Sequence, residues 1–163
     1  MIYQSSKTSE KTRQFILYIL KKRPNTSITG LMKITYLCDL ISTKKLKKQI
    51  SNLEYGRYNY GPFNSKIYRY IEELTQAKIL ESENDYGATG EEFGVYSVVK
   101  GKENKFDKIT KDEMNVIDEL LDSVRGLSAK ILTEIAYKTK PMKKLGATLG
   151  GGENLGKVLD LNA

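Results

Sequence analysis

The sequence predicts a mixed α+β fold that is mainly helical. Its 163 residues are close to the ~150 of an average domain, enough to bury one sizeable core. Apolar residues recur at helical spacing in several separate segments, which predicts amphipathic helices. Two short apolar runs flank an acidic, glycine-containing loop, which predicts one β-hairpin. We assign residues 1–145 to a single domain and the glycine-rich residues 146–163 to a mobile tail.

The first part of the chain is predicted to contain two helices. One stripe of apolar residues predicts a helix over residues 10–22, which Pro24 ends. A second stripe predicts a helix over residues 29–42, and the short basic segment 44–51 also fits a helix. Cys38 lies on the second stripe and is interpreted as a small core residue. The stripes consist of Phe15, Ile16, Ile19 and Leu20, and of Leu31, Ile34, Cys38 and Ile41.

An aromatic segment follows these helices. Aromatic residues at alternating positions predict a short strand within residues 53–63, which Gly61 and Pro62 break. A helix is predicted over residues 65–77, with Asn64 accepting backbone N–H bonds at its start.

The second half of the chain is predicted to hold a hairpin and two helices. The hairpin strands are residues 79–80 and 93–99. A capping box at Thr110 and Glu113 begins the next helix, and Ser128 begins the last one, which Pro141 closes. This order is that of a winged-helix-like core, with the hairpin as its wing, followed by two C-terminal helices.

The composition excludes several classes of active site. There is no histidine and only one cysteine, so a disulfide within the chain, a structural zinc site and a hydrolase with a histidine base are excluded. No acidic pair has the spacing of a catalytic dyad. We therefore predict a binding protein with no catalytic residue, cofactor or metal. We also expect a cytoplasmic location, because no secretory signal or apolar membrane span is visible.

Positive charge is concentrated near the N-terminus. Residues 1–52 contain eleven Lys and Arg residues against only Glu10 and Asp39, and the net charge of the whole chain is +7. Two interpretations stay open: a solvated surface, or a patch that attracts a polyanion or an acidic protein face. The densest part, called the basic patch below, consists of Lys44, Lys45, Lys47 and Lys48.

A dense group of aromatic residues predicts a protein-binding surface. Tyrosine gives a wide contact area at low entropic cost and is favoured at interfaces. We expect Phe63 and Tyr68 to be buried against each other. We expect some of the remaining tyrosines to be exposed as a docking face for an acidic protein. These are Tyr55, Tyr58, Tyr60 and Tyr70.

The order of elements also raises DNA binding as an alternative. The helix over residues 65–77 would be the recognition helix of a winged-helix protein. Glu72, Glu73 and the acidic wing would repel the phosphate backbone, which opposes this alternative. The candidate DNA-reading residues are Ser65, Lys66, Arg69 and Tyr70.

Three segments resemble the Panacea, or SocA-like, antitoxin domain family. Residues 30–39 (GLMKITYLCD) are similar to its KL-x-KL-x-YLA helix. Residues 58–68 (YNYGPFNSKIY) are similar to its YGP turn and the following helix. Residues 127–142 (LSAKILTEIAYKTKPM) are similar to its LSA…L…H…PW closing helix. This chain departs from the pattern at Tyr137, where many members have histidine, and at Met142, where many have tryptophan.

The resemblance implies a non-enzymatic antitoxin that binds its toxin directly, and one family member also delivers its toxin to a protease. Gly61 and Pro62 are expected to shape the turn. We predict a toxin partner and no membrane, while a protease, DNA and a homodimer stay open. The matching motif positions are Lys33, Tyr36, Tyr60, Gly61, Pro62, Tyr137 and Pro141, and the partner-binding candidates are Lys33, Tyr36, Tyr55, Tyr58, Tyr60, Tyr70 and Tyr137.

Overall fold

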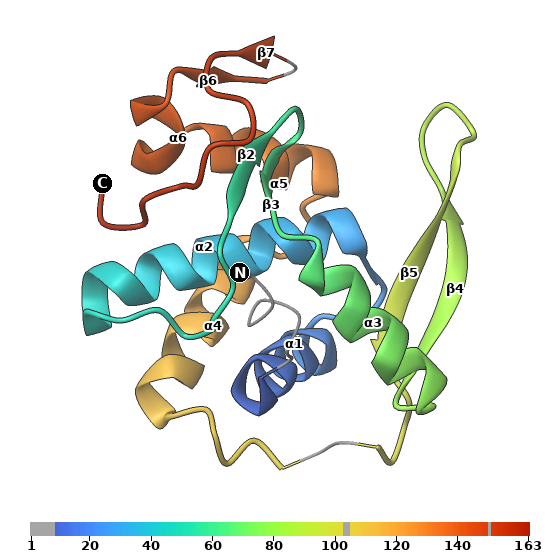
Figure 1. Ribbon diagram of the computed structural model, residues 1–163. Helices are drawn as coiled ribbons and strands as arrows, with labels where there is room; N and C mark the ends of the chain where they lie inside the picture. The colour runs from blue at the N-terminus through green and yellow to red at the C-terminus, as the bar shows by residue number, and fades with distance from the viewer. Residues whose placement is uncertain (1–8, 103–104, 150) are drawn as a thin grey trace.

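The helix α2 (Ile28–Leu46) lies at the centre of the computed structural model, and most other elements pack around it (Figure 1). The structure describes residues 9–102, 105–149 and 151–163. The other helices are α1 (Glu10–Lys22), α3 (Lys66–Gln76), α4 (Lys111–Ser123), α5 (Ala129–Tyr137) and α6 (Lys140–Lys144). The strands are β1 (Thr26–Ser27), β2 (Gly56–Tyr58), β3 (Gly61–Phe63), β4 (Leu80–Tyr86), β5 (Glu92–Val98), β6 (Ala147–Thr148) and β7 (Gly151–Gly152).

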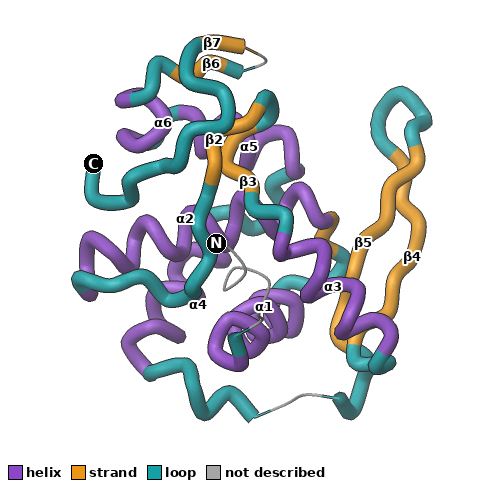
Figure 2. Tube along the Cα trace, viewed as in Figure 1, coloured by secondary structure: helices purple, strands orange, loops and turns teal. Residues whose placement is uncertain are grey.

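The strands form three small antiparallel sheets, and the prediction of a mixed helix-and-strand fold is confirmed. The largest sheet has the order β1-β5-β4 and contains the predicted hairpin, which projects away from the helices (Figure 2). Its register runs from Leu80 opposite Val98 to Tyr86 opposite Glu92, so its strands extend further toward the tip than the sequence predicts. None of the helices in the described residues is long and apolar enough to cross a membrane.

Helix starts follow the predicted capping chemistry. The hydroxyl of Thr110 accepts from the amide of Glu113 at 3.1 Å, and the Glu113 carboxylate accepts from the amide of Thr110 at 2.9 Å. Ser128 accepts in the same way at the start of α5. Asn64 accepts from the amide of Lys66 at 2.7 Å, although the first capping position of α3 is Ser65. Pro141 differs from the prediction, because it starts α6 instead of closing α5.

The sequence predicts that the basic segment 44–51 is helical, but the helix α2 ends at Leu46 and the residues after it form a loop. Lys47 adopts the left-handed conformation with φ of 63°, which ends the helix. The buried carboxylate of Asp39 then accepts from the amides of Ile50 and Ser51, both at 3.0 Å. A side chain on the helix therefore holds the following loop in place of further helical hydrogen bonds.

The aromatic segment forms a two-stranded hairpin instead of one strand. Arg57 lies opposite Pro62 and Tyr58 opposite Gly61, so the chain reverses at Asn59 and Tyr60. Gly61 has φ of +101°, a conformation that residues with a side chain rarely adopt. The glycine thus permits the turn that the sequence analysis treated as a strand end.

The C-terminal segment, which the sequence analysis treats as a mobile tail, lies against the β2 edge. The amide of Arg57 donates to the carbonyl oxygen of Lys157, and the amide of Leu159 to that of Tyr55, both at 2.8 Å. Leu159 and Leu161 are buried in the core. Residue 150 lies outside the described residues. The glycine-rich composition suggested mobility, whereas the two leucines supply the apolar area that holds this segment on the domain.

Candidate functional site

The three motif segments of the sequence meet at the β2–β3 hairpin, which lies beside α2 and α5 (Figure 1). The Lys33 Nζ on α2 donates to the carbonyl oxygen of Pro62 at 3.1 Å. The Tyr137 hydroxyl on α5 lies 2.6 Å from the carbonyl oxygen of Asn59 and 3.1 Å from that of Tyr58. Two helices therefore hold both sides of the turn through buried polar side chains.

Gly61 is required by this packing as well as by its own backbone. A Cβ added there would lie 3.3 Å from the Lys33 Cε and 3.6 Å from the Tyr137 ring. Below the turn, the hydroxyl groups of Tyr36 and Thr139 lie 2.7 Å apart, which links α2 to the start of α6. The motif residues form the support of the hairpin.

Five of the seven partner-binding candidates are buried, and two are exposed. Tyr58 and Tyr60 expose 45% and 71% of their surface, so these two candidates lie on the open surface. The other five are buried by folding and expose little area for direct contact, although the side chain of Lys33 lines the small pocket described below. These are Lys33, Tyr36, Tyr55, Tyr70 and Tyr137.

Tyr70 and Tyr68 exchange the roles predicted for them. Ile67, Tyr70 and Ile71 face the core, and the Tyr70 hydroxyl accepts from the amide of Ser9 at 2.7 Å. Tyr68 lies on the other face of α3 and is 49% exposed. The helical phase that places Ile67 inward turns its neighbour outward. Tyr68 is therefore a surface residue, contrary to the prediction.

Three exposed tyrosines and the half-buried Phe63 form a patch at the β2–β3 hairpin and the start of α3. The rings of Tyr58 and Phe63 pack edge to face with centroids 5.1 Å apart, and those of Phe63 and Tyr68 lie 6.1 Å apart. Tyr60 is the most exposed of the four, at the tip of the hairpin. We call Tyr58, Tyr60, Phe63 and Tyr68 the aromatic patch. It combines rigid support with exposed apolar area, as expected of a binding surface.

A small pocket of about 240 Å³ opens within the aromatic patch. Burial without a neighbouring carboxylate lowers the pKa of Lys33, which lines it, to about 8. The remaining lining residues are Tyr58, Asn59, Tyr60, Gly61 and Phe63.

Two residues that the sequence analysis did not select organise the support of the site. The carboxylate of Asp39 accepts from the hydroxyl groups of Tyr55 at 2.7 Å and Ser51 at 2.5 Å, in addition to its backbone donors. Burial raises the pKa of Asp39, although these hydrogen bonds oppose the rise. Arg57 is fully buried with its guanidinium 5.9 Å from the centre of the Tyr137 ring. The only sequence signal for Asp39 was that it is the single acidic residue of the segment that forms α2.

The basic patch is exposed but partly neutralised by the chain itself. Lys45 lies 3.3 Å from Glu119, and Lys48 lies 3.9 Å from the buried Glu113. Lys44 donates to the carbonyl oxygen of Ala163 at 3.2 Å, and Lys47 is exposed.

The DNA-reading candidates at the start of α3 differ in exposure. Ser65 and Arg69 are exposed, Lys66 is half-buried and Tyr70 is buried. Arg69 forms an ion pair with Glu73 at 3.3 Å.

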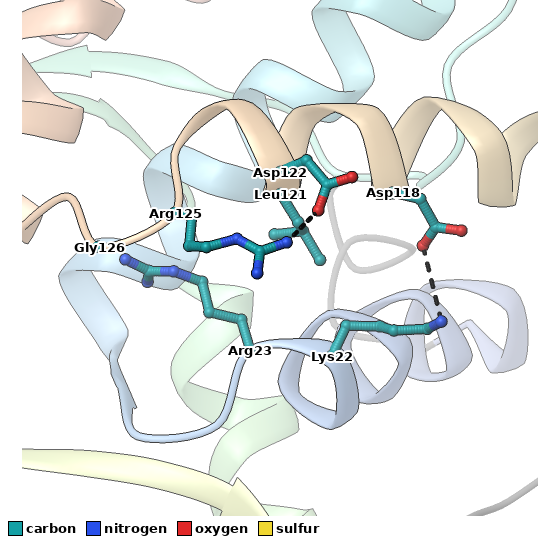
Figure 3. A pocket seen from close by; sticks show the side chains of 7 residues that line it. All are labelled: Lys22, Arg23, Asp118, Leu121, Asp122, Arg125 and Gly126. Carbon is teal, nitrogen blue, oxygen red and sulfur yellow. Dashed lines mark hydrogen bonds and ion pairs between the residues drawn. The ribbon is translucent and has the colours of Figure 1, made fainter.

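A second hollow, of about 430 Å³, lies between the C-terminal ends of α1 and α4 (Figure 3). Its charged residues are engaged with each other: Arg125 lies 2.6 Å from Asp122, and Lys22 lies 4.0 Å from Asp118. Arg23 donates to the carbonyl oxygen of Leu127 at 2.6 Å. In the described part of the chain, no group of His, Cys, Asp or Glu residues could hold a metal ion.

The comparison with protein families agrees with the motif geometry. A model described as "Antitoxin SocA-like, Panacea domain" matches residues 31–141. The chain belongs to this family. The matched range begins in α2, includes the β2–β3 hairpin and ends in α6, so it contains all three segments that support the aromatic patch. No curated protein and no solved structure matches the chain.

Proposed function

We propose that this Panacea-domain protein is an antitoxin that neutralises a partner toxin by direct protein–protein contact through the aromatic patch. The observation that carries the proposal is the exposure of Tyr58 and Tyr60 on a hairpin that Lys33 and Tyr137 hold in place. Interfaces draw most of their binding energy from a few anchored residues, among which tyrosine is enriched. Anchors on a fixed hairpin lose little conformational entropy on binding.

The proposed mechanism is stoichiometric occlusion of the toxin and requires no reaction by this chain. The basic N-terminal third would speed encounter with an acidic partner, since charge complementarity acts mainly on association rates. Delivery of the bound toxin to a protease is compatible with this contact and would need a surface outside the patch.

Co-expression with the product of the neighbouring reading frame tests the proposal. We expect the wild-type chain to form a complex with that protein and to restore growth. Tyr60→Ala should weaken the complex by about 2 kcal/mol, the loss typical of a central aromatic anchor. The matched control is Tyr86→Ala, because Tyr86 is 62% exposed on the other hairpin. Equal loss in both variants, or no complex with the wild-type chain, would contradict the proposal.

DNA binding by a winged-helix arrangement is the second candidate. It is supported by the sheet order β1-β5-β4 and by the packing of α3 beside β4, because in this candidate function the β4–β5 hairpin would serve as the wing and α3 as the recognition helix. The Arg69–Glu73 ion pair opposes it. Titration of the protein with promoter DNA at several salt concentrations tests this candidate function. Phosphate contacts give a steep negative slope of the logarithm of the affinity against the logarithm of the salt concentration. A slope near zero eliminates this candidate.

A further inference from the structure

Two buried cations beside the β2–β3 hairpin have no acidic partner. Lys33 is 3% exposed, and its ammonium group donates to the carbonyl oxygen of Pro62. Arg57 is fully buried, donates to the carbonyl oxygens of Tyr58 and Thr148, and has an Nε without a hydrogen-bond partner. Within the described residues, neither cation forms an ion pair with a carboxylate.

This arrangement is unusual for a folded domain, because burying an unpaired charge is costly. The buried carboxylate of Glu113, by contrast, has a cationic partner, since it lies 2.8 Å from the Nζ of Lys11. The hairpin therefore covers a region of positive potential that the described part of the chain leaves uncompensated. A site built in this way is suited to an anion that arrives from outside.

The pocket in the aromatic patch connects one of these two cations, Lys33, to the surface. Its lining includes the Lys33 side chain together with the exposed Tyr58 and Tyr60. An ammonium group has three donors, and the carbonyl oxygen of Pro62 takes one of them. The volume of the pocket is about 240 Å³. Because pockets for small-molecule ligands have volumes of ~300 Å³ or more, this pocket is better suited to a single side chain.

We infer that this pocket receives the carboxylate of one Asp or Glu side chain from the partner protein, with Lys33 as its counter-ion and the tyrosines as its walls. The inference rests on the proposed function and adds the chemistry of the contact. A nucleic-acid phosphate is the competing anion. Phosphate contacts are made by exposed basic side chains that follow the strand, whereas Lys33 is almost fully buried among aromatic groups.

The first test uses small probes and needs no partner. The wild-type chain, labelled with ¹⁵N, is titrated with N-acetylglutamate α-amide and, separately, with its neutral isostere N-acetylglutamine α-amide. We expect saturable amide shifts at Asn59, Tyr60 and Gly61 with the acid and at least about tenfold weaker binding of the neutral probe, since a charge-assisted hydrogen bond is lost. Equal shifts with both probes, or tighter binding of inorganic phosphate, would overturn the inference.

The second test removes the cation. Lys33→Met keeps the length of the side chain and should abolish the shifts caused by the glutamate probe, whereas Lys130→Met, at an exposed lysine on α5, should leave them unchanged. The wild-type titration stays decisive if Lys33→Met does not fold. Persistence of the glutamate shifts in folded Lys33→Met would contradict the inference.

The product of the neighbouring reading frame separates this inference from the proposed function. If the wild-type chain binds that protein and folded Lys33→Met binds it equally well, the carboxylate pocket is wrong and the antitoxin proposal stands. If the wild-type chain does not bind it but shows Lys33-dependent shifts with the glutamate probe, the antitoxin proposal fails and the anion site stands.

Discussion

The two exposed hairpins of this domain are stabilised in different ways. The β4–β5 hairpin pairs seven residues with seven and carries its own ladder of hydrogen bonds. The β2–β3 hairpin pairs only three with three. A ladder this short is marginal by itself, and it is held by Lys33, Tyr137 and the backbone of the C-terminal segment.

This difference between the hairpins supports the position proposed for the binding surface. The β4–β5 hairpin projects from the body of the molecule (Figure 2), and its aromatic residues Tyr86 and Phe93 are exposed. The aromatic patch lies on the hairpin that the core supports from both sides. A partner that binds there meets side chains whose positions are already set, which lowers the entropic cost of binding.

The largest effect is expected from an alanine at the supported turn. Gly61→Ala should reduce the free energy of unfolding by about 3 kcal/mol, because it combines a left-handed backbone with crowding against Lys33. Gly90→Ala is the matched control in the β4–β5 loop, where φ is +87° and a Cβ would meet nothing within 4 Å. It should cost about 1 kcal/mol from backbone strain alone. Urea unfolding measures the free energy of unfolding of both variants. Equal decreases in the two variants would contradict the proposed difference in support between the hairpins.

A smaller effect is expected from the segment that covers the β2 edge. Leu159→Ala should cost about 2 kcal/mol, since Leu159 is 5% exposed in the core. Phe93→Ala removes a larger side chain from β5, where it is 39% exposed, and should cost less than about 1 kcal/mol. Thermal and urea unfolding check this order. A negligible effect of Leu159→Ala would support the mobile tail suggested by composition.

The smallest effect concerns pH and Lys33. Its pKa in the folded state is lowered by burial to about 8 from 10.5, so the unfolded chain binds more protons between these values. The free energy of unfolding of the wild-type chain should therefore rise with pH across this window. Relative to Lys33→Met, we expect a gain of about 1 kcal/mol between pH 7 and pH 8.5. Parallel pH profiles for the two proteins would show that the Lys33 ammonium is not desolvated.

The sequence was most informative where local chemistry decides structure. Helix starts at Thr110 and Ser128 follow from their own side chains and the next few residues. The β4–β5 hairpin follows from two adjacent apolar runs. Prediction failed at Tyr68 and Tyr70, because a dense aromatic run does not reveal which side of a helix meets the core. It also failed beyond Leu46, where Asp39 competes for the backbone amides of the loop.

The motifs and their order along the chain were sufficient to identify the Panacea family and to predict helices joined by small hairpins, since both depend on residue identity and short-range spacing. Which of the motif residues are exposed was decided only by the tertiary structure. Lys33, Tyr36 and Tyr137 come from helices far apart in sequence, and their burial beneath the hairpin arises when those helices pack together. Exposure depends on packing between distant segments, which no local pattern of residues encodes.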